Sequence, residues 1–319
     1  MSRLRMGYVG CGFMAQSVHI PNLVGLPDCD LVAIAELRPE LAEKVQARYR
    51  IPKHYKSHVE LGQDPEIEAV GVSAHFALQG EIAIDLLNAG KHVFMEKPMA
   101  VSITQAERIL GAVEDSGCRL MVGYMKRYDA GNELVKRTVE QFLTTGELGS
   151  ITYVRNHGFC GNWTAGSDAD LETTDEPLPS VDPLIGKPDW LPDPYYGRYL
   201  GYLQQYTHNI NLLRWFLDTG DKVTVEGVHL GPDGMRGIVV LDLNGTQAII
   251  ESGRVAYHGW DEHTQIFFEK GWVKTDAPPL LLKNVPATVH VYRAEPSRQV
   301  QHLLPDAVWS WSYPVSYTH

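Results

Sequence analysis

The chain has 319 residues, of which 44% are hydrophobic and 21% are charged, the composition of an ordinary globular protein large enough for two domains. Its formal net charge of -11 argues against nucleic acid or an anionic membrane as a general partner, since either would require a basic surface. No segment has the pattern of a signal peptide or of a membrane span, and the 4 cysteines show no metal or redox spacing. We therefore expect a cytoplasmic protein with reduced thiols and no metal site.

The first predicted strand, Leu4–Val9, leads directly into a glycine-rich turn of the form G-x-G-x-x-A. In a dinucleotide fold the first glycine permits the tight turn, the second lets the backbone approach a pyrophosphate, and the small third residue allows close helix packing. The residues of this turn that we expect to bind a dinucleotide are Gly10, Gly12, Phe13, Met14 and Ala15.

A second apolar run, residues 31–35, ends in Glu36, at about the distance where an acid binds the ribose hydroxyl groups. An acid at this position would repel the 2′-phosphate of NADP, so Glu36 favours NAD as the cofactor. Arg38, two residues later, could accommodate that phosphate and leaves NADP possible.

Helices and strands alternate as far as residue 124. This pattern predicts right-handed βαβ units and a doubly wound parallel sheet, so residues 1–124 are expected to form a Rossmann domain of the α/β class. The predicted elements are a helix at 39–49, a strand at 67–73, a helix at 80–89, a strand around Val93, a helix from Ser102 to Gly117 and a strand at 120–122.

After Gly123 several strands follow one another without helices between them, which is typical of an antiparallel sheet. Residues 125–319 are therefore predicted to form an α+β domain. Its predicted elements are a helix at 132–143 that stops at Gly146 and strands at 150–159, 223–230, 237–243, 246–252 and 264–269.

Residues 163–196 are rich in Asp, Glu and Pro and show no clear periodicity. Long loops inside compact domains are often lids or binding loops. A solvated surface insertion is an equally good interpretation of this segment, and both stay open.

The segment from Lys91 to Pro98 predicts a buried strand that carries Glu96, Lys97 and Pro98 at its carboxyl end. In an open α/β sheet that end is where ligands bind, and the proline biases Lys97 toward an extended conformation. Taken alone, Lys97 would be interpreted as a solvated surface residue.

Four motifs together change that interpretation. They are Gly10–Ala15, the run A-G-K-H-V-F-M-E-K-P-M-A at 89–100, G-Y-M-K-R-Y at 123–128 and T-H-N-I-N-L-L-R-W at 207–215. In this order they resemble the Gfo/Idh/MocA family of oxidoreductases. The resemblance implies a Rossmann domain and a second domain with a large open sheet often used to form homodimers or tetramers. It also implies hydride transfer between a nicotinamide cofactor and a sugar, cyclitol or related polyol.

The resemblance places the family's catalytic lysine on Lys97 and its acid/base histidine on His208. The physical basis is that loss of a hydride from a carbinol carbon requires the hydroxyl group to lose a proton, so a nearby ammonium stabilises the alkoxide and an imidazole accepts the proton. Further cofactor contacts implied by the resemblance are Ser73, Ala74, His75, Glu96 and Lys97. Candidate substrate contacts are Arg127, Tyr128, Trp163, Gln204, Tyr206 and His208.

The sequence also departs from the family pattern. Gln204 and Asn211 stand where aspartates are expected on either side of His208, and residues 74–79 lack the usual Thr-Pro-Asn-x-x-His wording. Two alternatives therefore stay open: a sugar lyase or glycosidase that oxidises its substrate only transiently, and a cofactor-binding protein without catalysis. The end of the chain, 314–319, resembles a truncation or a foreign tail.

Overall fold

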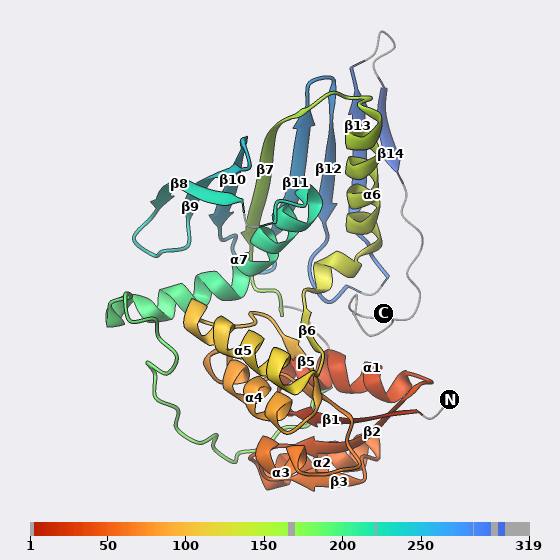
Figure 1. The fold of residues 1–319 in the computed structure, drawn as a ribbon, viewed down its shortest axis with the longest axis vertical. Helices are drawn as coiled ribbons and strands as arrows, with labels where there is room; N and C mark the ends of the chain where they lie inside the picture. The colour runs from red at the N-terminus through yellow and green to blue at the C-terminus, as the bar shows by residue number, and fades with distance from the viewer. Residues whose placement is uncertain (1–2, 165–169, 221, 283, 295–298, 304–319) are drawn as a thin grey trace. The chain divides into compact units, whose positions relative to one another are not determined.

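The computed structural model describes residues 3–164, 170–220, 222–282, 284–294 and 299–303 (Figure 1). The predicted tail at 314–319 lies outside them. The chain groups into two compact units, Met1–Gly123 with Asp168–Leu200, and Tyr124–Ser167 with Gly201–His319. Among the helices of the described residues, none combines the length and apolar character that crossing a membrane requires.

The first unit contains a six-stranded sheet in the order β3-β2-β1-β4-β5-β6, and every neighbouring pair is parallel. This arrangement confirms the predicted Rossmann sheet. The strand order reverses between β1 and β4, and ligands bind at the carboxyl ends beside such a reversal. The strands are β1 Leu4–Val9, β2 Cys29–Ala35, β3 Lys53–Tyr55, β4 Ala69–Val72, β5 His92–Glu96 and β6 Leu120–Gly123.

The helices of this unit begin and end at local signals. Ser102 caps α5 by accepting a hydrogen bond from the Gln105 amide, and Gly117 ends it at a φ of 65°, as predicted. α4 begins before the predicted residue 80, because His75 Nδ1 accepts the Ala77 amide and caps the helix there. The helical elements are the π-helical turn Ala15–His19, α1 Ile20–Gly25, α2 Pro39–Tyr49, α3 His58–Gly62, α4 Phe76–Asn88, α5 Ile103–Ser116 and the 3₁₀ turn Asp193–Tyr195.

The second unit is built on an eight-stranded sheet in the order β14-β13-β12-β11-β7-β10-β9-β8. Among the described strands of this second sheet, only the β7–β10 pair is parallel, so the predicted mainly antiparallel sheet is confirmed. The strands are β7 Ile151–Cys160, β8 Val223–Leu230, β9 Gly237–Leu243, β10 Thr246–Gly253, β11 Trp260–Phe268, β12 Gly271–Ala277, β13 Thr288–Arg293 and β14 Gln299–Leu303.

The helices α6 (Ala130–Thr145) and α7 (Tyr196–Leu217) pack on this sheet, and the 3₁₀ turn Met125–Tyr128 precedes α6 (Figure 1). β7 and β11 alternate buried and partly exposed residues, the pattern of a sheet with one face in the core. The core residues come from both helices and from the strands, and include Val135, Val139, Phe142, Leu212, Leu213, Phe216, Ile250, Ile266 and Val273.

Residues 170–200 group with the first unit, whereas the sequence placed every residue after 124 in the second domain. The reason is a set of contacts that the local sequence does not reveal. The Tyr199 hydroxyl donates to the Val101 carbonyl at 2.8 Å, and the side chains of Leu191 and Tyr196 are buried. Figure 1 shows this light-green segment extending from the start of α7 toward α2. Whether it acts as a lid stays a prediction.

The backbone at Gly10, in the turn after β1, has a conformation and a close neighbour that only glycine tolerates. Its φ is +92°, and a Cβ at this position would lie 2.4 Å from the Ser73 carbonyl oxygen. We expect Gly10→Ala to lower the free energy of unfolding by about 3 kcal/mol or more. Gly117 is the matched control, since its φ is +65° and a Cβ there meets nothing within 4 Å, so Gly117→Ala should cost about 1 kcal/mol. Urea unfolding without cofactor measures both, and equal losses would contradict the close approach.

Candidate cofactor and catalytic sites

The glycine turn lies between the carboxyl ends of β1 and β4. The Gly10 amide donates to the Ala35 carbonyl at 2.8 Å, and the Ser73 amide donates to the Val9 carbonyl at 3.1 Å. Gly12 is exposed, and a Cβ there would meet nothing within 4 Å, so this side of the turn is open. The backbone is thus accessible to a pyrophosphate. The helix expected after the glycine turn begins as the π-helical turn Ala15–His19.

The predicted ribose-binding acid is fixed beside this turn. Glu36 is buried, its Oε2 accepts the Cys11 amide at 2.8 Å, and its Oε1 accepts Arg38 Nε at 2.8 Å. Burial raises the pKa of Glu36, but the hydrogen bonds from Arg38 and Cys11 outweigh it, so the net pKa is lowered and the group is a carboxylate. The structure therefore brings the glycine turn, Glu36 and Arg38 together, which fits a nicotinamide dinucleotide.

The three predicted residues after β4 share the same edge of the sheet. Ser73 follows β4 directly and contacts the Gly10 turn, Ala74 is partly buried, and His75 is exposed and caps α4. Their position at the carboxyl end of a strand next to β1 is the one from which such residues contact a bound dinucleotide.

Lys97 follows β5 on a backbone that a buried side chain holds in place. Gln79 is fully buried, and its Nε2 donates to the carbonyls of Glu96 at 2.9 Å and Pro98 at 2.5 Å. The Lys97 amide donates to Glu96 Oε2 at 3.1 Å, and its Nζ lies 5.8 Å from the centre of the Phe76 ring. The Lys97–Pro98 peptide bond is cis. The chain thus presents a partly buried lysine from a rigid support.

A buried pair of side chains beneath Lys97 was missed by the sequence reasoning. His19 Nε2 lies 2.8 Å from Glu96 Oε1, and the His19 ring stacks on Tyr8 and meets the edge of Phe94. Burial raises the pKa of Glu96, but the hydrogen bond and charge of His19 and the charge of Lys97 lower it more, so the net shift is downward. No local pattern could reveal this pair, because its members are 77 residues apart.

In the second unit, the motif at 123–128 meets the motif at 207–215. Arg127 Nε donates to Asn211 Oδ1 at 2.7 Å, and the guanidinium lies 5.8 Å and 5.9 Å from the centres of the Tyr124 and Trp215 rings. Asn211 thus supplies a neutral acceptor where the family pattern has an acid. The predicted substrate residue Arg127 is therefore held in a fixed orientation.

α7 carries His208, which is buried, and Gln204 one turn earlier. The helix is pinned to the sheet by an amide chain in which Asn209 Nδ2 donates to Asn156 Oδ1 at 2.7 Å and Asn156 Nδ2 donates to Thr264 Oγ1 at 2.7 Å. Because Asn209 adjoins His208, these bonds fix the rotation of α7 at the candidate acid/base residue.

Three other predicted substrate residues also lie in this unit. Tyr206 is fully buried, its hydroxyl accepts the Gly253 amide at 2.8 Å, and burial raises its pKa to about 12. Its hydroxyl also bonds backbone carbonyls, so these contacts describe a residue that anchors α7 rather than one available to a substrate. Tyr128 ends the 3₁₀ turn before α6, and Trp163 follows β7; both are partly buried.

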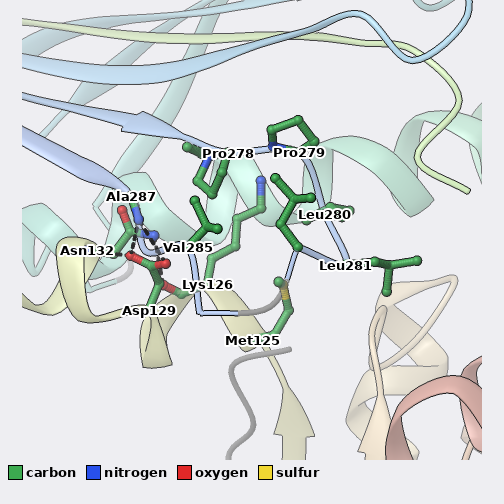
Figure 2. A pocket seen from close by; sticks show the side chains of 12 residues that line it. Met125, Lys126, Asp129, Asn132, Pro278, Pro279, Leu280, Leu281, Val285 and Ala287 are labelled. Atoms are coloured by element: carbon green, nitrogen blue, oxygen red, sulfur yellow. Dashed lines mark hydrogen bonds between the residues drawn. The ribbon is translucent and has the colours of Figure 1, made fainter. Parts of the chain in front are cut away.

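A pocket in the second unit is lined mainly by apolar residues of the segment after β12 (Figure 2). Lys126 points into it and is paired with Glu262. Asp129 connects α6 to the residue before β13, because its carboxylate accepts hydrogen bonds from the amides of Asn132 at 3.0 Å and Ala287 at 3.1 Å. A polyol requires many polar partners, so we do not assign the substrate to this apolar pocket. Its other lining residues are Met125, Ala277, Pro278, Pro279, Leu280, Leu281, Leu282 and Val285.

One group of side chains on the second sheet has potential metal-ligating atoms within 4.8 Å of one another, namely those of His157, Asp261 and His263. His157 Nδ1 is 2.7 Å from Glu251 Oε2, and His263 Nδ1 is 3.1 Å from Asp261 Oδ1. Hydrogen bonding among the four side chains accounts for this arrangement, and we assign no ion to it.

The contact between His19 and Glu96 should make the free energy of unfolding depend on pH in the acidic range. Because the folded-state pKa of Glu96 lies below its ordinary value of 4.5, the carboxylate stabilises the fold above that pH, and this contribution is lost as the pH falls through the folded pKa. We expect Glu96→Gln to cost about 1–3 kcal/mol at pH 7 and less at acidic pH. Glu114→Gln, at an exposed position of α5, is the control. Denaturant unfolding from pH 7 to pH 3 measures the difference, and a cost that does not change with pH contradicts it.

Comparison with known proteins agrees with this geometry. Residues 4–124 match the model of an oxidoreductase family with an NAD-binding Rossmann fold. Myo-inositol 2-dehydrogenase of Thermotoga maritima is 25% identical over 284 residues, which cover 86% of this chain and 75% of that protein. Inositol 2-dehydrogenase of Salmonella typhimurium is 32% identical over 158 residues, which cover 49% and 45%.

Solved structures show the same fold. A 3-ketoreductase from Actinomadura kijaniata, solved with NADP and TDP-benzene, has a TM-score of 0.70 at 20% identity and covers 95% of this chain and 85% of that one. The scyllo-inositol dehydrogenase of Lactobacillus casei has a TM-score of 0.65 at 23% identity and covers 92% and 81%.

Proposed function

The chain belongs to the Gfo/Idh/MocA family of NAD(P)-dependent oxidoreductases, and on that premise we propose that it transfers a hydride between NAD(H) and a CH–OH group of a cyclitol, sugar or related polyol. The observation that carries this proposal is the placement of Lys97 at the carboxyl end of β5, in the same unit as the glycine turn and Glu36. The names of the inositol dehydrogenases among its relatives support a cyclitol as substrate.

The role we propose for Lys97 follows from charge. A bound nicotinamide would supply the hydride acceptor for oxidation and the hydride donor for reduction. Lys97 donates a hydrogen bond to the reacting oxygen and stabilises the negative charge that develops there. Gln79 and Glu96 contribute by fixing the backbone from which the ammonium extends, so little reorganisation is required.

His208 is the proposed acid/base group. Its imidazole accepts the proton of the substrate hydroxyl in oxidation and returns it in reduction. Gln204, one turn earlier on α7, can hydrogen-bond a substrate hydroxyl or the imidazole without adding a charge. Arg127 supplies hydrogen-bond donors and Asn211 supplies an amide, and both belong to the same unit as His208. Such groups can bind a neutral substrate that has several hydroxyl groups. A homodimer or tetramer stays a prediction.

Gln204 also supports a second candidate. At that position a neutral amide stands where the family pattern has a carboxylate, and in this candidate reaction transient oxidation followed by elimination at a neighbouring bond would return the hydride within the same cycle. A cofactor-binding protein without catalysis is the third possibility, and the retention of both Lys97 and His208 argues against it, because nucleotide binding alone requires neither.

Replacing Lys97 separates catalysis from cofactor binding. We expect Lys97→Ala to lower kcat by about 100- to 1,000-fold, because the developing alkoxide loses its charged hydrogen bond. Lys97→Arg keeps the charge but not the geometry of the ammonium, so it should restore only part of the rate. NADH binding, followed by fluorescence titration, should change only a few-fold in both variants. Turnover that persists in Lys97→Ala would remove Lys97 from the mechanism.

The products distinguish net oxidation from transient oxidation. With a panel of cyclitols, polyols and their glycosides, we expect one NADH formed per ketone released, measured by nicotinamide absorbance beside chromatography. Cleavage of a glycoside without net NADH would instead establish the lyase. If no compound of the panel reacts and no nicotinamide cofactor binds, the proposed function is wrong.

A further inference from the structure

We propose that Glu176 is a specificity residue that makes the cofactor site select NAD over NADP, by filling with its own carboxylate a position that a 2′-phosphate would occupy. The inference rests on the cofactor site of the proposed function and deepens it. Glu176 belongs to the 170–176 segment, which is part of the first unit. No pattern in the sequence predicts a role for this segment in selecting the cofactor.

The start of α2 has no capping side chain of its own. Arg38 is its N-cap residue and makes no side-chain capping bond, and Pro39 at the first position has no amide hydrogen. The first amides of the helix are therefore those of Glu40 and Leu41. Glu176 Oε2 accepts both, at 2.9 Å and 3.4 Å. A carboxylate from 136 residues away thus occupies the anion-binding end of this helix.

The second step is the location of that helix end. It follows Glu36, the acid expected to bind the ribose, by only a few residues. A 2′-phosphate is attached to one of the ribose hydroxyls that such an acid binds, and it is usually accommodated by a nearby arginine or by helix amides. Here Arg38 is engaged by Glu36 and the α2 amides are engaged by Glu176. Both groups that could hold the phosphate already have a carboxylate partner.

The third step is that the 170–176 segment is held in place by several independent bonds. The Gln16 side chain exchanges two hydrogen bonds with the Glu172 backbone, at 2.9 Å and 3.1 Å, and also donates to the Cys11 carbonyl at 2.7 Å. Lys44 Nζ donates to the Thr173 carbonyl at 2.8 Å. The segment is thereby joined to the glycine turn, where the pyrophosphate is expected, and to α2, which begins a few residues after Glu36.

The charges at the start of α2 also oppose a bound phosphate. Glu36, Glu40 and Glu176 face this end of α2 against Arg38, while Lys44 pairs with Glu40. The pKa of Arg38 is raised, first because of its hydrogen bond to Glu36, and the charge of Glu176 makes the smallest contribution in the same direction. A dianionic phosphate entering here would meet uncompensated negative charge.

The test compares the dissociation constants of NADPH and NADH, measured by fluorescence titration of the full chain at fixed ionic strength. We expect the wild-type protein to bind NADH much more tightly, and Glu176→Gln and Glu176→Ala to lower the NADPH-to-NADH ratio of these constants by about tenfold or more. Glu176→Gln keeps an oxygen that can accept the α2 amides, so it guards against loss of local structure. Asp175→Ala is the matched control, because it removes the same charge from the neighbouring, exposed position and should change the ratio less than about threefold.

The outcomes separate this inference from the proposed function. If wild-type protein binds NADH and the Glu176 variants leave the ratio unchanged, or if wild-type protein binds NADPH as tightly as NADH, Glu176 does not select the cofactor. If Asp175→Ala changes the ratio as much as Glu176→Ala, general charge and not the contact with α2 is responsible, and the inference is also wrong. If neither nucleotide binds the wild-type protein, the proposed function itself fails.

Discussion

The contact between His19 and Glu96 joins the two parts of the first unit on which the proposed chemistry depends. His19 ends the helical turn that follows the glycine turn, and Glu96 ends the strand that carries Lys97. Both side chains are buried and lose water as a hydrogen-bond partner, so keeping this bond couples the position of the glycine turn to that of the lysine. Glu96 Oε2 extends this coupling by accepting the Lys97 amide.

The same use of buried polar side chains recurs in the second unit. Asn209 and Asn156 tie α7 to β7 and β11, and Asn211 holds Arg127. Of these residues, Asn211 is a neutral amide where the family pattern has an acid, and its partner Arg127 is a guanidinium. A neutral amide costs less to bury than a carboxylate and does not oppose binding of an uncharged polyol. The departures at Gln204 and Asn211 are therefore compatible with a folded, ordered site.

Carboxylates of the chain accept hydrogen bonds from the positively polarised groups around Glu36 and the start of α2. Glu36 accepts hydrogen bonds from the Cys11 amide and the Arg38 side chain, and Glu176 accepts hydrogen bonds from the first amides of α2. An NAD-binding site needs acceptors for ribose hydroxyls but no site for an additional anion. The fold itself permits NADP in a solved relative from Actinomadura kijaniata, so the choice of cofactor depends on such side chains and not on the architecture.

The sequence by itself determined the features that depend on local spacing. β1, the glycine turn, Glu36 and the Glu96-Lys97-Pro98 run follow from neighbouring residues, and the Ser102 cap and Gly117 stop of α5 do so as well. Strands with mixed polar and apolar residues, such as β3 and β12, carry too weak a pattern to be predicted. Only the tertiary structure decided the partners of His19, the bond between Arg127 and Asn211, and the contact of Glu176 with α2, which join residues 77, 84 and 136 positions apart. The reason is physical: periodicity reports which face of an element is buried, whereas a side-chain hydrogen bond forms only when folding brings two distant elements to the same place.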